Sequence, residues 1–178
     1  MEQRVEADKQ DGELPGRRAG PRVGRMNRRR FLILALVATL ALAAPAALAL
    51  VSFEKSELTI ESGEAKHRFE IEVARTSDQM TQGLMFRPKM APDAGMLFLY
   101  SPPQPVAMWM YQTLIPLDML FIGADGRVTN IHERAVPGST ATIESGGPVR
   151  AVLELNGGTA ARLKLKPGDR VRHKEIDN

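Results

Sequence analysis

The sequence predicts an α+β domain that is mainly antiparallel β, with a compact barrel-like sheet and two short helices. Roughly seven or eight short segments alternate polar and apolar residues or form short apolar runs, as strands do. Only two segments carry helix-start signals. They do not alternate with the strands in the order that a doubly wound parallel sheet requires.

The first predicted elements are two strands and a helix. Residues 57–61 and 67–74 alternate polar and apolar side chains, so both are predicted to be half-buried strands. Thr76 follows, with Gln79 three residues later. In this capping-box arrangement the two side chains satisfy free N–H groups at a helix start. The sequence therefore predicts a short helix that ends near Gly83.

The middle of the chain is predicted to contain four strands. Residues 95–100 and 106–110 are apolar strands, separated by a proline-rich loop at 101–105. Residues 116–122 and 127–133 are predicted to form a hairpin. The Asp-Gly pair between them suits the left-handed backbone conformations of a tight turn.

The C-terminal part combines loop and turn signals with one strand and one helix. Residues 136–148 are rich in Pro, Gly, Ser and Thr and are predicted to be a surface loop. A strand is expected at 149–156 and a short helix at 159–165, begun by a threonine cap. A Lys-Pro-Gly-Asp turn at 166–169 leads into the last strand at 170–173.

Changes of composition along the chain predict its domain organisation. Residues 1–25 are polar without apolar periodicity, which indicates either a disordered extension or a mis-called start, with Met26 as the true first residue. Residues 26–49 are predicted to be a signal peptide. Residues 50–66 then form a lead-in strand, and residues 67–174 form a single domain.

The predicted signal peptide has a cationic Arg-Arg-Arg start, an apolar run from Phe31 and small residues that end at Ala49. We therefore expect an exported protein, periplasmic or extracellular. The segment would anchor the chain in a membrane only if it stayed uncleaved, and its proline and alanine-rich end favour cleavage. The arginines before Phe-Leu also resemble a twin-arginine signal, with the general secretory route as the alternative.

Charge is unevenly distributed along the chain. Of the 24 Lys and Arg residues, nine precede residue 50, which leaves 15 against 16 acidic residues in the remainder. The predicted mature domain is therefore near neutral and has no basic run, so we expect no nucleic-acid partner. The absence of cysteine excludes disulfides, thiolate nucleophiles and cysteine-based metal sites.

Four motifs carry a resemblance to a known family. They are GLMFR at 83–87, GMLF at 95–98, WMYQTLIPLD at 109–118 and VLE at 152–154. In this order they resemble domain of unknown function 192, an uncharacterised group of bacterial and archaeal proteins that are often exported. The resemblance implies a compact, mainly β domain and no established activity. The family usually has Asn where this chain has Gln112.

Charged residues beside apolar strand segments are the candidates for a functional site, because a buried charge needs a partner. We interpret the domain as a non-catalytic module in which an arginine and one or two carboxylates hold a small polar ligand against an aromatic face. A cell-envelope component is the alternative partner. Internal salt bridges and turn caps are the structural alternative. The charged set is Arg87, Asp118, Glu133, Glu154 and Asp169, and the predicted ligand-binding residues are Arg87, Trp109, Thr113, Asp118 and Glu154.

Two other functions are consistent with the sequence. A carboxylate-dependent hydrolase of envelope glycans would use Asp118 and Glu154 as catalytic residues, about 5–10 Å apart on one side of the sheet. The sequence indicates no cofactor for either this hydrolase or a binding module.

The clustering of methionines suggests the second of these functions, binding of copper. Seven of the nine methionines lie between Met80 and Met119. Thioether sulfur favours Cu(I), so a copper site is a further hypothesis. Core packing is the alternative, because methionine is an adaptable core filler. The candidate ligands are Met96, Met108, Met110 and His132.

Overall fold

The computed structural model describes residues 51–177, which form one sheet of seven strands and two short helices. The predicted signal peptide and the polar segment before it lie outside these residues. Between residues 51 and 177, no helix is long and apolar enough to cross a membrane. The strands are β1 (Glu54–Ser62), β2 (Ala65–Ala74), β3 (Ala94–Met108), β4 (Leu117–Ile122), β5 (Val128–Ala135), β6 (Ile143–Asn156) and β7 (Arg170–Arg172), and the helices are α2 (Ser77–Gln82) and α3 (Thr159–Leu163).

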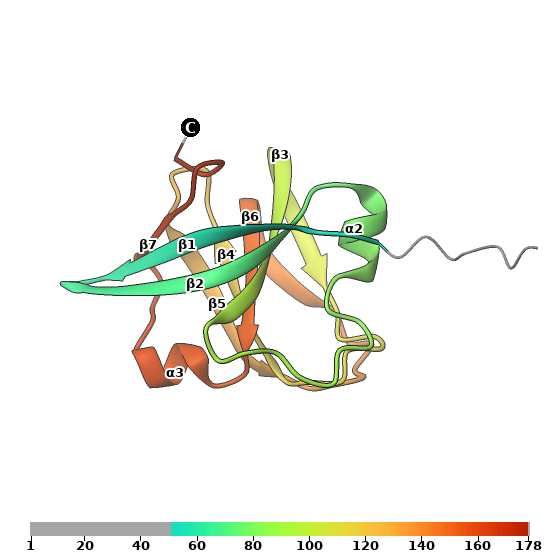
Figure 1. Cartoon of the computed structure of the whole chain (residues 1–178). Helices are drawn as coiled ribbons and strands as arrows, with labels where there is room; N and C mark the ends of the chain where they lie inside the picture. The colour runs from blue at the N-terminus through green and yellow to red at the C-terminus, as the bar shows by residue number, and fades with distance from the viewer. Residues whose placement is uncertain (1–50, 178) are drawn as a thin grey trace, which may run out of the picture. The chain divides into compact units, whose positions relative to one another are not determined.

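The sheet has the strand order β5-β4-β6-β3-β2-β1-β7 and curls into a half-barrel (Figure 1). Every neighbouring pair is antiparallel except β2 and β3, which run parallel. Backbone bonds join the two edge strands: Val128 N donates to Asp169 O at 2.9 Å, and Val171 N donates to Gly126 O at 2.8 Å. The predicted fold class is therefore confirmed.

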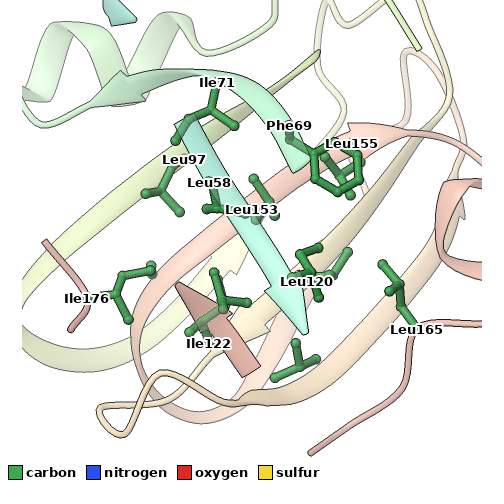
Figure 2. Close-up of a cluster of buried hydrophobic side chains, with 14 of the residues drawn as sticks. Leu58, Phe69, Ile71, Leu97, Leu120, Ile122, Leu153, Leu155, Leu165 and Ile176 are labelled. Atoms are coloured by element: carbon green, nitrogen blue, oxygen red, sulfur yellow. The ribbon is translucent and has the colours of Figure 1, made fainter. Parts of the chain in front are cut away.

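The concave face of the sheet holds an aliphatic core, which we call the inner core (Figure 2). Strand β2 explains how it forms. Phe69, Ile71 and Val73 are buried, whereas Arg68 and Glu70, which alternate with them, are exposed, as a half-buried strand requires. The other main contributors are Leu58, Leu97, Leu120, Ile122, Leu153, Leu155 and Ile176.

A second apolar cluster, the outer layer, packs on the opposite face of the same strands. Phe98, Phe121 and Val152 supply its sheet side. Residues from α2 and from the loops at 83–93 and 109–116 cover it. Figure 1 shows α2 and α3 on opposite sides of the curled sheet, so α3 is not part of this cover. The methionines of the outer layer are Met80, Met90, Met96, Met108, Met110 and Met119.

Helix α2 forms as its local sequence predicts. Gln79 N donates to Thr76 Oγ1 at 3.2 Å, and Thr76 N donates to Gln79 Oε1 at 3.1 Å, which completes the capping box. The helix ends at Gly83, whose φ of 45° lies in the region that glycine tolerates best.

One predicted loop is wholly strand and another is partly strand, while residues 136–142 form a loop as predicted. Residues 101–105 belong to β3, which is continuous from 94 to 108, and 143–148 belong to β6. The two strands pair through this region with register shifts around the prolines. A proline lacks an N–H donor, but a bulge does not need that donor, so prolines that look like a loop in sequence can lie in a bulged strand.

Two predicted turns form with different local geometry. In the β4–β5 hairpin only Gly126 of the Asp-Gly pair has a positive φ, at 77°. Asp125 instead accepts a bond from Arg127 N at 3.1 Å. In helix α3 the N-cap is Gly158, which has no side chain to bond. Thr159 is buried, so the predicted threonine cap is wrong, and a distant carboxylate takes its place.

Candidate functional site

The carboxylate that caps helix α3 belongs to Asp118, which is fully buried in β4. Its Oδ1 accepts bonds from Arg134 N at 2.8 Å and from Gly158 N at 2.9 Å. Its Oδ2 accepts a bond from Ala160 N at 2.7 Å. Asp118 therefore joins β4, the end of β5 and the start of α3, and its charge is satisfied by three backbone donors.

Arg134 occupies an unusual backbone position. Its φ is 53°, in the left-handed region, and it lies where β5 carries one residue more than β4 between Ala135 and His132. The bond from Arg134 N to Asp118 stabilises this bulge. The guanidinium lies over Gly158, where a Cβ would be only 3.2 Å from Arg134 Nη2. Asp118 thus sets the positions of both the arginine and the glycine beneath it.

Two adjoining pockets open beside Arg134, and we call them together the arginine groove. The first, of about 550 Å³, is lined by Arg134, Thr159 and Arg162 among others. The second, of about 320 Å³, is lined by His67, Arg68 and Arg162 among others. Arg162 and Pro92 border both pockets. The groove therefore brings together side chains from β2, β5 and α3.

The arginines of this groove differ from the other arginines of the domain. In the range 51–177, six of nine arginines place the guanidinium near a protein oxygen: Arg75, Arg87, Arg127, Arg150, Arg170 and Arg172. The other three, Arg68, Arg134 and Arg162, have no such partner within that range, and all three line the groove. His67 Nε2, beside them, is a buried ring nitrogen that also finds no protein partner there.

Most of the ligand-binding residues predicted from the sequence lie elsewhere. Arg87 pairs with Glu72, and its guanidinium carbon lies 5.6 Å from the centre of the Phe53 ring. Thr113 is buried, and its hydroxyl donates to Tyr111 O at 3.4 Å. Trp109 is 53% exposed. The structure therefore does not bring the predicted set together in one pocket.

The two carboxyl groups of the hydrolase hypothesis lie on opposite faces of the sheet. Glu154 is aligned with Met119, whereas Asp118 is aligned with Leu155. Because successive residues of a strand point to opposite faces, Glu154 faces the outer layer and Asp118 faces the other side. The two groups cannot flank one glycosidic bond, and Asp118 already accepts three backbone bonds.

Glu154 is the one ionisable side chain buried within the outer layer of the described domain. It lies between Met96 of β3 and Met119 of β4, and no hydrogen-bond partner for its carboxyl is found within residues 51–177. Burial raises the pKa of Glu154 to about 8. Burial also raises the pKa of Tyr100 to about 12, with the Glu154 charge as a smaller cause.

The proposed copper ligands lie on the outer-layer side of the sheet. Met96, Met108 and Met110 pack in the outer layer. Met108 Sδ accepts a weak bond from the Tyr100 hydroxyl at 3.7 Å. His132 is exposed, next to Met119 across the strands. Over residues 51–177 no three His, Asp or Glu side chains converge as metal ligands.

The two remaining charged candidates have local roles. Glu133 is exposed at the β5 bulge. Asp169 accepts a bond from Lys166 N at 2.9 Å and so caps the Pro-Gly turn.

The sequence did not single out the arginines of the groove. Arg68, Arg134 and Arg162 belong to different elements, and an isolated arginine on a strand or helix resembles any solvated surface residue. The adjacent Gly157 and Gly158 are the one local signal. A Cβ at Gly157 would lie 2.9 Å from Pro116, so this glycine marks a close approach of two chain segments.

A family model for domain of unknown function 192 (DUF192), described as an uncharacterized ACR, matches residues 58–173. The chain belongs to the DUF192 family. The match covers every strand except the start of β1, together with the arginine groove. No curated protein matches the chain.

Two solved structures resemble this DUF192 domain. A Sinorhizobium meliloti protein provisionally described as a transcription regulator is 48% identical, with a TM-score of 0.69 over 70% of this chain and 98% of that one. A Novosphingobium aromaticivorans protein of unknown function is 44% identical, with a TM-score of 0.68 over 74% of this chain and 94% of that one. These similarities support the fold and leave the activity open.

Proposed function

We propose that this DUF192 domain is a non-catalytic module that binds a small anionic ligand in the arginine groove. One observation carries the proposal. The three arginines that lack a protein partner within residues 51–177 are the three that line the groove, while the other arginines of that range are paired. The groove lining carries Arg68, Arg134, Arg162 and Lys66 against one acid, Asp93, so it is locally positive in a near-neutral domain.

The chemistry of the groove favours a carboxylate or a phosphate. A guanidinium donates two parallel bonds to either group, and such charge-assisted bonds are about twice as strong as neutral ones. Arg134 is held by its own backbone bond to buried Asp118, so part of the ordering is complete before a ligand binds. His67 Nε2 adds a ring nitrogen without a partner in residues 51–177.

We also propose that the domain works outside the cytoplasm, after export directed by residues 26–49. The support is the three-part signal-peptide sequence. Cell fractionation of the full-length chain should find a mature form that starts after Ala49. A protein that stays in the cytoplasm with its leader intact would contradict this.

The binding proposal is tested with inorganic phosphate and citrate as probes, titrated into ¹⁵N-labelled domain at low salt. We expect amide shifts to concentrate near Gly158 and Arg162. Arg134→Gln combined with Arg162→Gln should weaken binding about tenfold or more, because each lost charged bond contributes about 1.5–3 kcal/mol.

Arg127→Gln combined with Arg172→Gln is the matched control, since it also removes two positive charges, both outside the groove lining, and should leave binding unchanged. Equal weakening by the control would indicate a non-specific charge effect. Shifts that are absent, or that lie outside the groove, would overturn the proposal.

A further inference from the structure

A second surface of the domain exposes large apolar side chains. Three loops contribute to it: 83–93, 109–116 and 136–142. We call it the aromatic patch, and it consists of Phe86, Trp109, Tyr111, Leu114 and Val136, which are 42–68% exposed. They are the large hydrophobic side chains that the described part of the chain leaves exposed. Trp109 and Tyr111 lie together, with ring centres 5.5 Å apart.

Backbone bonds hold the three loops together as one unit. Phe86 N donates to Gln112 O at 2.9 Å, which joins the first loop to the second. Gly138 N lies 3.1 Å from Met110 O, and Met110 N donates to Ser139 O at 3.0 Å, which joins the second loop to the third. The exposed side chains therefore stand on a common support rather than on independent loops.

The backbone of this support is strained where it displays the patch. Phe86 has a φ of 62° and Gln112 has a φ of 53°, both in the left-handed region that bulky side chains rarely adopt. The Phe86–Gln112 bond stabilises both residues in it. Such strained residues persist where the surrounding structure holds them, and they gather at functional sites.

Two of the three loops of the patch lack charge, whereas the first, 83–93, contains Arg87, Lys89 and Asp93. Neither residues 95–117 nor residues 135–143 contain Asp, Glu, Lys, Arg or His. A charge-depleted surface with aromatic residues at its centre is typical of the buried part of a protein–protein interface. Trp, Tyr and Arg are also the residues that most often dominate binding energy.

The patch adjoins the arginine groove at two points. Val136 follows Arg134 by two residues at the end of β5. Leu114 precedes Pro116 by two residues, and Pro116 O accepts a bond at 2.8 Å from Gly157 N, a residue of the groove lining. Two residues of the patch are therefore within two positions of residues that form or contact the lining of a groove with three arginines.

We infer that the patch and the groove together bind one protein partner, through an apolar segment followed by acidic side chains. This rests on the proposed function, because the arginine groove would bind the acidic end. Three guanidinium groups match more than one carboxylate, which favours acidic side chains over a single terminal carboxyl. The apolar side chains of the partner would pack on Trp109 and Leu114.

Trp109 provides a direct reporter, because it is the only tryptophan of the chain. The probes are three acetylated, amidated heptapeptides: four leucine or phenylalanine residues followed by three glutamates, the same peptide with glutamines, and four serines followed by three glutamates. The first should shift Trp109 emission to the blue with saturation. The second should bind about tenfold more weakly. The third should shift groove amides without changing Trp109 emission.

Leu114→Ser and Phe86→Asn should each weaken binding of the first peptide several-fold while leaving phosphate binding unchanged. Both side chains are more than half exposed, and Asn tolerates a positive φ, so the melting temperature should stay that of the wild type. Arg127→Gln combined with Arg172→Gln again serves as the control. If a variant unfolds, the comparison of the three peptides on the wild type still decides the inference.

Several outcomes would overturn the inference and spare the proposed function. The first and third peptides could bind equally, which would exclude the patch. A blue shift that grows with protein concentration, together with a dimer in sedimentation, would make a second copy the occupant. A blue shift with anionic vesicles but not with peptides would make it a membrane.

If phosphate and citrate fail to bind while the first two peptides bind equally, the proposed function fails and the patch acts alone.

Discussion

The two apolar layers of the domain differ in composition. The inner core is built from Leu, Ile, Val and Ala with one phenylalanine and, among the described residues, no methionine, and the buried carboxylate at its edge, Asp118, accepts three backbone bonds (Figure 2). The outer layer has six methionines, two buried phenylalanines and the buried carboxyl of Glu154. Each central strand therefore contributes one face to the inner core and the other face to the outer layer.

This difference indicates a division of roles. Branched aliphatic side chains have few rotamers and define strand register closely, whereas methionine adapts to irregular neighbours. The outer layer supports the loops that display the aromatic patch, and those loops have irregular backbones. We expect the inner core to determine stability and the outer layer to accommodate the binding surface.

The largest effect is expected for a truncation in the inner core. Leu153→Ala removes a fully buried side chain and leaves a cavity between rigid neighbours, so it should lower the free energy of unfolding by about 3–5 kcal/mol. Urea denaturation measures it. A loss below about 1 kcal/mol would mean that the inner core rearranges as easily as the outer layer is expected to.

Asp118→Asn tests the carboxylate at the end of the inner face. It weakens three charge-assisted bonds and turns one acceptor into a donor that faces backbone N–H groups, so we expect a loss of about 3 kcal/mol. Anion binding should weaken too, because Arg134 loses its anchor. Asp169→Asn is the matched control, because Asp169 is also buried but accepts a single backbone bond, so the expected loss is about 1 kcal/mol. Equal losses would contradict the role assigned to Asp118.

Glu154 makes the stability contributed by the outer layer depend on pH. Its pKa in the folded state, about 8, lies above that of the unfolded chain, so the folded state binds the extra proton between about pH 4.5 and 8. Stability should therefore fall as pH rises through this window, by about 3 kcal/mol from pH 5 to pH 8.

Glu154→Gln should flatten this profile and be more stable than the wild type at pH 8. Thermal unfolding at several pH values measures both. Glu57→Gln, on an exposed position of β1, controls for the loss of a carboxyl elsewhere. Parallel profiles for the wild type and Glu154→Gln would show that the buried carboxyl does not titrate in this window.

The smallest effect is expected for Met96→Leu in the outer layer. The two side chains have similar volumes and methionine packing is adaptable, so the loss should be below about 1.5 kcal/mol. Chemical denaturation checks it. A loss as large as that of Leu153→Ala would contradict the adaptable outer layer and would favour a specific role for this sulfur.

The sequence correctly predicted the elements that form through interactions between residues close together in the chain. The alternation in β2 and the Thr76–Gln79 capping box both formed as expected. The prolines at 102, 103 and 105 indicated a loop, but pairing with β6 keeps them in a strand. The threonine expected to begin α3 is buried, and a carboxylate from β4 caps that helix instead. In both cases a partner distant in the sequence outweighed the local preference.

The sequence alone determined the fold class, the family, the near-neutral charge of residues 50–178 and the expectation of export. These follow from composition, periodicity and motifs, which can be read from a segment of sequence without knowing its neighbours in the folded structure. Only the tertiary structure separated Asp118 from Glu154, gathered around one groove three arginines that have no protein partner among residues 51–177, and linked the aromatic patch to that groove. Those relations depend on which residues of distant strands and loops become neighbours in the folded domain. They also depend on which charged side chains are already paired with another residue.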